Sequence, residues 1–343
     1  ACGLTAALGG DRSGHTWERA APDPAPDQSQ ADRAAIRLVA VGDILLDRGV
    51  ARKTAVHGPD YPFARVAERL RSVDIAFGNL ECPITRSGAA AAKPFSFCAT
   101  PESARGLVSA GFGILSLANN HVLDRSRQGL TDTMRFLREA APSGIAWCGA
   151  GPNAEAASAP AILVRKGLRI AFVGFCDIVQ DTSYPRGDLP SVAQASHEAV
   201  ERAVRRARSQ ADTVIASFHW GIEYEPRPTE RQRALARTAV AAGCDLVIGH
   251  HPHVLQGVQR IPRPGRSPAL VAYSLGNFVF DTRRPPADMT AMLEVTLDRT
   301  GVRDFRLVPC RIVACRPVTV SGARAAEILE RVRKISKETQ TSR

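Results

Sequence analysis

The sequence predicts an α/β fold with mixed β-sheets. Short apolar runs, which are typical of buried strands, alternate with longer stretches of helical periodicity through most of the chain. Toward the C-terminus, residues 289–296 and 305–313 alternate between apolar and polar positions, as antiparallel strands do. Residues 35–335 contain no internal repeat and no domain boundary, so we expect one domain there. We expect a flexible tether at residues 1–34 and a short tail at residues 336–343.

The expected elements follow one another in a regular order. Each predicted strand is a short apolar run, and the runs occupy residues 35–41, 74–77, 113–117, 145–148, 161–164, 169–175, 213–218, 245–248, 270–273, 289–296 and 305–313. Apolar side chains recur at helical spacing in residues 61–72, 101–110, 127–140, 191–209, 229–242 and 323–335. In the first of these helices, Phe63, Val66 and Leu70 share one face.

Polar side chains that can bind a metal ion follow several of the predicted strands. In chain order they are Asp43, Asn79 with Glu81, Asn120 with His121, His219, and His251 with His253. Because ligands bind beyond the carboxyl ends of parallel strands, we expect these residues to meet at one edge of the fold. Carboxylate, amide oxygen and imidazole together suit one or two divalent ions such as Mn, Fe or Zn.

The stretch from Gly249 to His253 is the part of the sequence that most strongly indicates metal binding. It follows a short apolar run and contains three of the eight histidines. His251 and His253 are two residues apart, so they point to the same side if the segment is extended. Burying several imidazoles at a strand end is unfavourable without a ligand to satisfy them. We therefore expect His251 and His253 to bind metal, and His250 to contact a substrate.

Each of these residues also has a simpler explanation when it is taken alone. Asp43 could be a turn residue after a glycine, and His219 could be a hydrogen-bonded core histidine. Three residues that follow His219 have two equally good interpretations. Trp220, Glu223 and Tyr224 could line a substrate-binding wall, or they could pack their loop against the sheet.

Six motifs in order give the sequence a specific resemblance to a known family. They are Val41–Asp43, Gly78–Thr85, Leu117–His121 with Asp124, His219–Tyr224, Gly249–Gln256 and Tyr273–Asp281. On these motifs, the chain from about residue 36 to residue 282 resembles the CapA family, also called PgsA. These are bacterial proteins of poly-γ-glutamate capsule synthesis, and the resemblance implies a role in that synthesis or in export of the polymer.

The CapA family is in turn similar to the calcineurin-like metallophosphoesterases. That similarity implies a four-layer αββα sandwich with a dinuclear metal site. It implies the following metal ligands: Asp43, Glu81 or Asn79, Asn120, His219, His251 and His253. Asp43 and His121 would be the catalytic residues, with His121 as the general acid. Two departures leave the number of ions open, because Leu45 replaces a ligand histidine, and Asn79 and Glu81 stand where a bridging aspartate is expected.

These observations favour a metal-dependent hydrolase that cleaves a phosphoester or a glutamyl amide. The alternative is a non-catalytic accessory that binds polyglutamate beside the membrane subunits of a capsule synthase. A third hypothesis is a biosynthetic enzyme that acts on a small molecule. Fold alone does not decide among them.

Charge, cysteine content and the first residues of the sequence bear on the binding partners and the cellular location of the protein. The net charge of +11 suits an anionic polymer, whereas the absence of a nucleic-acid motif excludes nucleic acid as a partner. No CxxC pair occurs among the eight cysteines, which argues against a zinc ribbon, and Cys82–Cys98 and Cys310–Cys315 are candidate disulfides. The start Ala1-Cys2-Gly3 resembles a processed bacterial lipoprotein, so we expect an exported protein anchored to a membrane through Cys2. An arbitrary chain start is the other interpretation.

Overall fold

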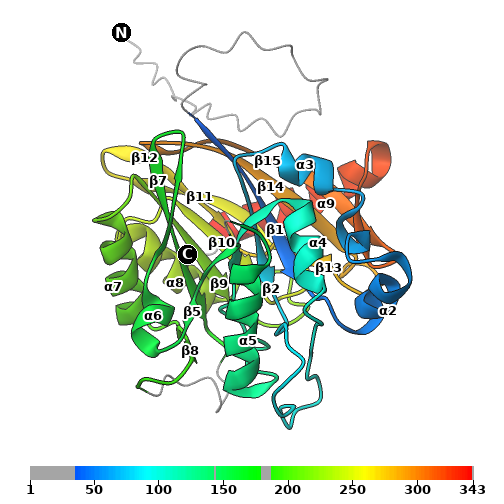
Figure 1. Ribbon diagram of the computed structural model, residues 1–343. Coiled ribbons are helices and arrows are strands. Elements are labelled where there is room, and N and C mark those ends of the chain that lie inside the picture. The colour runs from blue at the N-terminus through cyan, green and yellow to red at the C-terminus, as the bar shows by residue number, and fades with distance from the viewer. Residues whose placement is uncertain (1–34, 143, 179–186, 342–343) are drawn as a thin grey trace, which may run out of the picture. The chain divides into compact units, whose positions relative to one another are not determined.

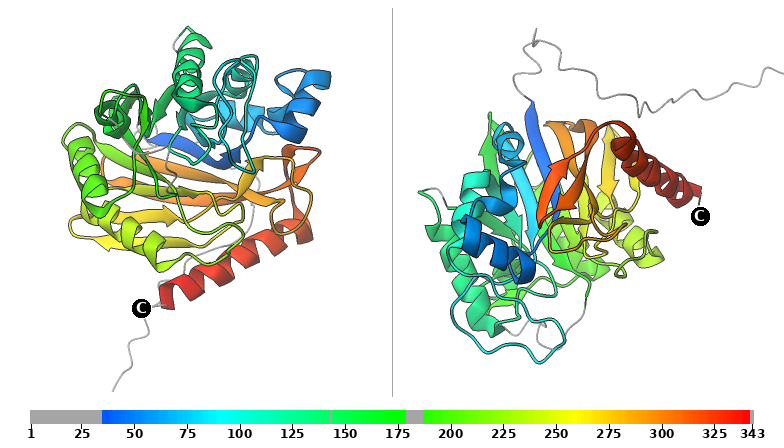
Figure 2. Two further views of the ribbon diagram at one scale, coloured as in Figure 1. Left: turned by 90° about the horizontal axis from the view of Figure 1, so that it is seen from below. Right: turned by 90° about the vertical axis from the view of Figure 1, so that its right-hand side faces the viewer.

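The computed structural model describes residues 35–142, 144–178 and 187–341, so the predicted tether at 1–34 lies outside the described residues. Within the folded unit that begins at Ala34, two β-sheets pack face to face, and helices cover the outer face of each sheet (Figures 1 and 2). Both sheets contain parallel and antiparallel neighbours. The predicted four-layer αββα sandwich with mixed sheets is therefore confirmed.

The first sheet is built around the central strand β1 (Ile36–Ile44). Its order is β16-β15-β14-β1-β2-β3-β4, and β13 also pairs with β1. The parallel members on one side of β1 are β2 (Ile75–Leu80), β3 (Phe112–Ser116) and β4 (Ala146–Cys148). The other strands are β13 (Asn277–Val279), which is parallel to β1, and the antiparallel β14 (Met289–Asp298), β15 (Gly301–Val313) and β16 (Arg316–Thr319).

The second sheet has the order β11-β12-β10-β9-β7-β6. Its parallel centre consists of β7 (Leu168–Cys176), β9 (Thr213–His219), β10 (Leu246–His250) and β12 (Arg266–Ala272). The antiparallel edge strands are β6 (Ala161–Arg165) and β11 (Val258–Arg263), and a separate small sheet pairs β5 (Ala150–Gly151) with β8 (Ser191–Val192).

The helices complete the two outer layers. Those beside the first sheet are α2 (Arg48–His57), η1 (Tyr61–Phe63), α3 (Ala67–Arg71), α4 (Ser103–Ala110) and α5 (Ser126–Glu139). Those beside the second are α6 (Ala154–Ser158), α7 (His197–Arg208) and α8 (Glu230–Ala241). The last helix, α9 (Gly322–Thr341), packs against β11 and β15. None of the described helices combines the length and apolarity that crossing a membrane requires.

The structure corrects several expectations about the elements. Helix α2 was not predicted, because only Gly49 and Val50 are buried in it. The predicted tail begins inside α9, where Ser336 and Thr339 are buried and the Ser336 hydroxyl accepts a 2.8 Å bond from the backbone N–H of Val258. Residues 336–341 therefore belong to the folded unit. The cysteines of the two candidate disulfides, Cys82, Cys98, Cys310 and Cys315, are free.

Close packing at the end of β10 requires a glycine at position 249. A Cβ atom there would lie 1.9 Å from the Tyr273 carbonyl oxygen and 2.6 Å from Trp220 Nε1. Glycine lets β10 run between its neighbours, in register with His219 of β9 at His250. The carboxyl ends of β9 and β10 thus reach the edge where β1 and β2 of the first sheet also end.

The opposite end of β10 carries a buried ionic cluster. Asp245 is fully buried and pairs with three arginines, Arg208, Arg263 and Arg266, at 2.7–3.1 Å. It also accepts a 2.8 Å bond from the backbone N–H of Val214. The cluster ties β10, β11, β12 and α7 together at a distance from the polar strand ends.

We predict that Asp245→Ala lowers the free energy of unfolding by about 3–5 kcal/mol, because it leaves buried arginine charge without a partner. Glu201→Ala is the matched control, since it breaks an exposed ion pair with Arg205 and should cost about 0–1 kcal/mol. Urea denaturation measures both values. Equal losses in the two variants would contradict a structural role for the Asp245 cluster.

Candidate metal centre

The polar residues predicted at the strand ends converge at one edge of the fold. Asp43 lies near the end of β1, Glu81 directly after β2, and His219 at the end of β9. His251 and His253 follow β10 in a loop. All five are at most 7% exposed, so two sheets bury five ionisable side chains in one place.

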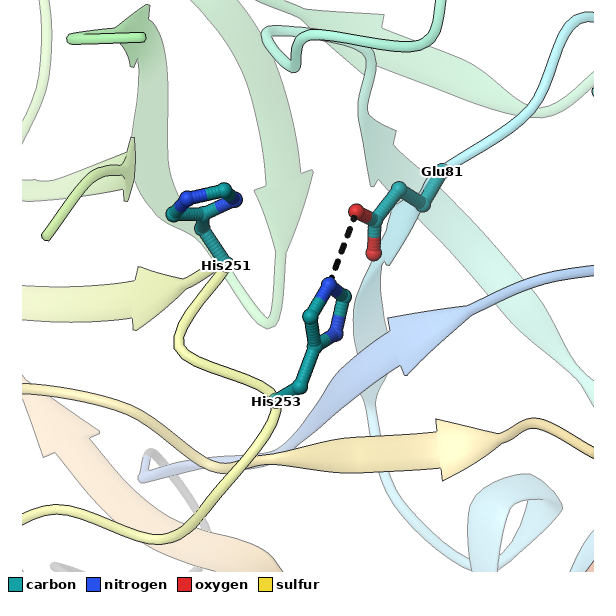
Figure 3. A group of neighbouring side chains, drawn as sticks. All are labelled: Glu81, His251 and His253. Atoms are coloured by element: carbon teal, nitrogen blue, oxygen red, sulfur yellow. Dashed lines mark ion pairs between the residues drawn. The ribbon is translucent and has the colours of Figure 1, made fainter. Parts of the chain in front are cut away.

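Glu81, His251 and His253 form the tightest group of potential ligands, as Figure 3 shows. One ligand atom from each residue lies within 4.8 Å of the others. Glu81 Oε1 lies 3.7 Å from His253 Nε2 and 3.6 Å from His219 Nε2. Among the described residues, neither Glu81 oxygen has a hydrogen-bond partner, and His251 Nδ1 also has none. Buried polar atoms without partners are rare in proteins, so these three side chains fit a divalent cation that they would hold.

Burial and close charges shift the pKa of every side chain in the group. Burial raises the pKa of Glu81 well above its ordinary value, and the charge of Asp43 adds to the rise. Burial and neighbouring His253 lower the pKa of His251 to about 3, and burial likewise holds the pKa of His219 well below its ordinary value. Burial would lower the pKa of His253, but the charges of Glu81 and Asp43 raise it to about 9. Neutral imidazoles such as those of His219 and His251 are the form that binds metals.

Asp43 joins the residues of the two sheets. Its carboxylate accepts a 2.9 Å bond from Asn79 Nδ2 and a 3.3 Å bond from the His251 backbone N–H. The Nδ1 atoms of His250 and His253 lie 3.3 Å and 3.4 Å from it. Burial would raise the pKa of Asp43, but the proximity of these two histidines holds it well below its ordinary value. Asp43 is therefore an ionised carboxylate at the centre of the constellation.

Asn79 connects neighbouring side chains by hydrogen bonds, so its amide is not free to bind a metal ion. Its Nδ2 faces Asp43 and lies 3.3 Å from His219 Nδ1, and its Oδ1 accepts a 3.0 Å bond from Asn119 Nδ2. Because the side-chain oxygen of Asn79 is already bonded, Glu81 is the better metal ligand of the two.

Asn120 lies on the side of the site where Glu81 lies. Its Oδ1 is 2.8 Å from His219 Nε2, the same nitrogen that Glu81 Oε1 approaches. Asn119 was not predicted as part of the site, although the Asn-Asn pair was visible in the sequence.

His121 lies beside the group and is oriented by Asp124. Asp124 Oδ2 is 2.8 Å from His121 Nδ1 and also accepts a 2.7 Å bond from the Phe97 backbone N–H. Lys93 forms an ion pair with Asp124 and donates a 2.8 Å bond to the Asn120 carbonyl. Burial lowers the pKa of His121, and Asp124 opposes the change. Nothing in the sequence around Lys93, a lysine after an alanine run, indicated this placement.

The predicted substrate residues separate into two kinds. Trp220 is fully buried, its Nε1 donates a 2.9 Å bond to the Tyr273 carbonyl, and its ring stacks on Phe218. The packing interpretation therefore holds for Trp220, and the substrate-wall interpretation is wrong for it. His250 is likewise buried, against Asp43 and Phe77, so it faces the protein interior rather than a substrate.

Glu223 and Tyr224, in contrast, are exposed at the same edge, and the Tyr224 ring centroid lies 6.1 Å from that of His253. Both remain candidates for substrate contact. Tyr224, His251 and His253 all have positive φ angles, of 62°, 94° and 58°. Left-handed backbone is unfavourable for residues with a Cβ and is concentrated at functional sites.

Comparisons with known proteins show that the chain is similar to bacterial capsule synthesis proteins. The family model described as "Bacterial capsule synthesis protein PGA_cap" matches residues 37–282. "Capsule biosynthesis protein CapA" of Bacillus anthracis is 31% identical over 316 residues, covering 90% of this chain and 75% of that protein. "PGA biosynthesis protein CapA" of Bacillus subtilis (strain 168) is 33% identical over 283 residues, covering 82% and 72%.

Two solved nucleotidase structures are similar at low sequence identity. The 5'-nucleotidase precursor from Thermus thermophilus superposes with a TM-score of 0.49 and 15% identity, over 89% of this chain and 59% of that chain. The NAD nucleotidase of Haemophilus influenzae gives 0.47 and 14%, over 88% and 63%. The chain thus spans less than two thirds of either nucleotidase.

We predict that Glu81→Gln abolishes stabilisation by Mn²⁺, because it keeps the shape of the side chain and removes its charge. Saturating a site at one hundred times its Kd stabilises a protein by about 2.7 kcal/mol, which thermal unfolding with and without the ion would detect. The exposed Glu223→Gln makes the same charge change nearby and should keep the shift. Elemental analysis showing full metal content in Glu81→Gln would contradict the assignment.

Proposed function

The chain belongs to the bacterial capsule synthesis protein family PGA_cap, and from this premise we propose that it is a metal-dependent hydrolase of poly-γ-glutamate capsule biosynthesis. The observation that carries the proposal is the buried Glu81 carboxylate, which faces His251 and His253 and has no hydrogen-bond partner among the described residues. Its contacts with His219 at 3.6 Å and with His253 at 3.7 Å are longer than hydrogen bonds, so a ligand shared with the histidines would satisfy the carboxylate better. The bond cleaved is a phosphoester or a glutamyl amide.

The biological setting rests on the relatives. Two of them are named for capsule or PGA biosynthesis, and the net charge of +11 suits an anionic polymer such as polyglutamate. We place the protein outside the cytoplasm, next to the membrane subunits of a capsule synthase. The expected lipid anchor at Cys2 lies outside the described residues.

Glu81, His251 and His253 would hold the first ion. A second ion would be held by Asp43, Asn120 and His219, and it would replace the 2.8 Å contact between Asn120 Oδ1 and His219 Nε2. When bound, a divalent cation supplies Lewis-acid activation of the oxygen nucleophile and of the scissile group. Asp124 lies against Nδ1 of His121, so Nε2 is the ring nitrogen from which His121, in its imidazolium form, would give a proton to a leaving group and become neutral. Asn79 holds Asp43 and His219 in place through its amide.

One observation favours the non-catalytic alternative. Leu45 stands where the metallophosphoesterases carry a metal-binding histidine, and it is completely buried. Its backbone N–H bonds the Val279 carbonyl at 2.9 Å, so the position belongs to the β1–β13 pairing. A protein that binds one ion and uses it to hold polyglutamate, without cleaving a bond, would be compatible with this replacement.

We predict that the wild-type protein loaded with Mn²⁺ hydrolyses bis-p-nitrophenyl phosphate or a γ-glutamyl oligomer, and that His121→Ala lowers kcat by about 10²–10⁴-fold. His121 is not among the proposed ligands, so elemental analysis should find unchanged metal content in the variant. The exposed His57→Ala, which makes the same side-chain change on α2, should keep full activity.

Two results would count against catalysis. A wild-type protein that holds its full complement of metal and cleaves neither substrate would favour the accessory function. Equal rates for wild type and His121→Ala would remove His121 from the reaction.

A further inference from the structure

Arg48 lies at the exposed margin of the site and is neither a proposed metal ligand nor the proposed proton donor. It is the first residue of α2, and its φ of 55° places it in the same left-handed region as Tyr224, His251 and His253. The side chain is 38% exposed. An arginine held in strained backbone beside a candidate metal centre calls for an explanation in terms of what it contacts.

Two aromatic rings connect Arg48 to opposite sides of the site. The guanidinium carbon lies 5.6 Å from the Phe97 ring centroid and 5.5 Å from that of Phe280. Phe97 in turn packs on His121, with centroids 4.3 Å apart, and Phe280 packs on His253 at 5.2 Å. Arg48 therefore spans the side of the site between the proposed proton donor and a proposed metal ligand, and cation–π contacts hold it there.

Asp281 fixes the orientation of the guanidinium. Arg48 donates to it from Nε, at 3.1 Å, and from Nη2, and the backbone N–H of Gly49 donates to the same carboxylate at 3.1 Å. The arginine side chain has five N–H donors, and among the described residues only Asp281 accepts from the guanidinium of Arg48. The remaining donors sit on a planar group that cannot turn freely and that water can reach.

We propose that Arg48 is a substrate-recognition residue, which binds an oxyanion of the substrate, a carboxylate or a phosphate, next to the metal centre. The inference rests on the proposed function, because it names the chemical class that the same site accepts. A fixed guanidinium matches the two oxygens of such a group, which a lysine does not. Tyr224, exposed on the neighbouring loop, is placed to contact the same substrate.

Arg48 contacts two aromatic rings with its flat face and a carboxylate with its edge, and this combination explains why the position needs arginine. The flat guanidinium covers both rings, while its edge reaches Asp281 and the solvent. Asp281 neutralises part of the charge, so binding depends on directed hydrogen bonds more than on net charge. Arg48→Lys keeps the positive charge but loses the paired N–H donors of the guanidinium, so it should keep only part of the affinity for the oxyanion.

The test measures anion binding without turnover, by isothermal titration calorimetry on the full chain, both as purified and loaded with Mn²⁺. The probes are γ-glutamylglutamate and inorganic phosphate, which separate a carboxylate source from a phosphate source. We expect Arg48→Met to weaken binding of at least one probe by roughly 10- to 100-fold, and Arg48→Lys to weaken it less. Arg52→Met, an exposed arginine on the same helix, carries the same charge change and should bind as the wild type does.

Unchanged binding in Arg48→Met, a loss matched by Arg52→Met, or no binding of either probe to the wild type would overturn the proposal. Arg48→Lys keeps the test decisive if Arg48→Met fails to fold, which circular dichroism would reveal. An absence of hydrolysis alongside Arg48-dependent anion binding would count against the proposed function while this inference stands.

Discussion

The site depends on one electrostatic constraint, the burial of the Glu81 carboxylate against His251 and His253. Taking a carboxylate out of water is unfavourable by several kcal/mol unless a hydrogen bond or an opposite charge compensates for it. Among the described residues, no hydrogen bond reaches either oxygen of Glu81, and its ion pair with His253 spans 3.7 Å. A divalent cation would compensate the burial directly, and it would also favour the neutral form of the histidines around it.

The fold meets this constraint by bringing the ends of two sheets together. β1 and β2 deliver Asp43 and Glu81 from one sheet, and β9 and β10 deliver the histidines from the other. The apolar core between the sheets sets their spacing, and the loop that carries His251 and His253 is itself buried against them. Asn79 then links the two sheets through its contact with His219, and Asn119 holds Asn79 within the first sheet. Arg48 lies at the exposed margin.

Much of the architecture could be predicted because apolar runs end abruptly at polar residues, as β10 does before His251. The parallel order of the strands then placed those residues at one edge. Side-chain direction could not be predicted in the same way. The backbone N–H of Trp220 bonds the His250 carbonyl and so continues the pairing of β9 with β10. The Trp220 ring therefore points toward the helices outside the second sheet, where it stacks on Phe218. Arg48 and Lys93 gave no signal, because their roles depend on contacts with residues far away in the chain.

The most direct test of the central claim is a crystal structure of the full chain soaked with Mn²⁺, with diffraction recorded on both sides of the manganese absorption edge. We expect an anomalous peak within about 2.0–2.3 Å of a Glu81 oxygen and of a nitrogen of His251 or His253, a distance typical of carboxylate and imidazole ligands. Crystals that show no anomalous density there, with both Glu81 oxygens hydrogen-bonded to protein groups or water instead, would contradict it.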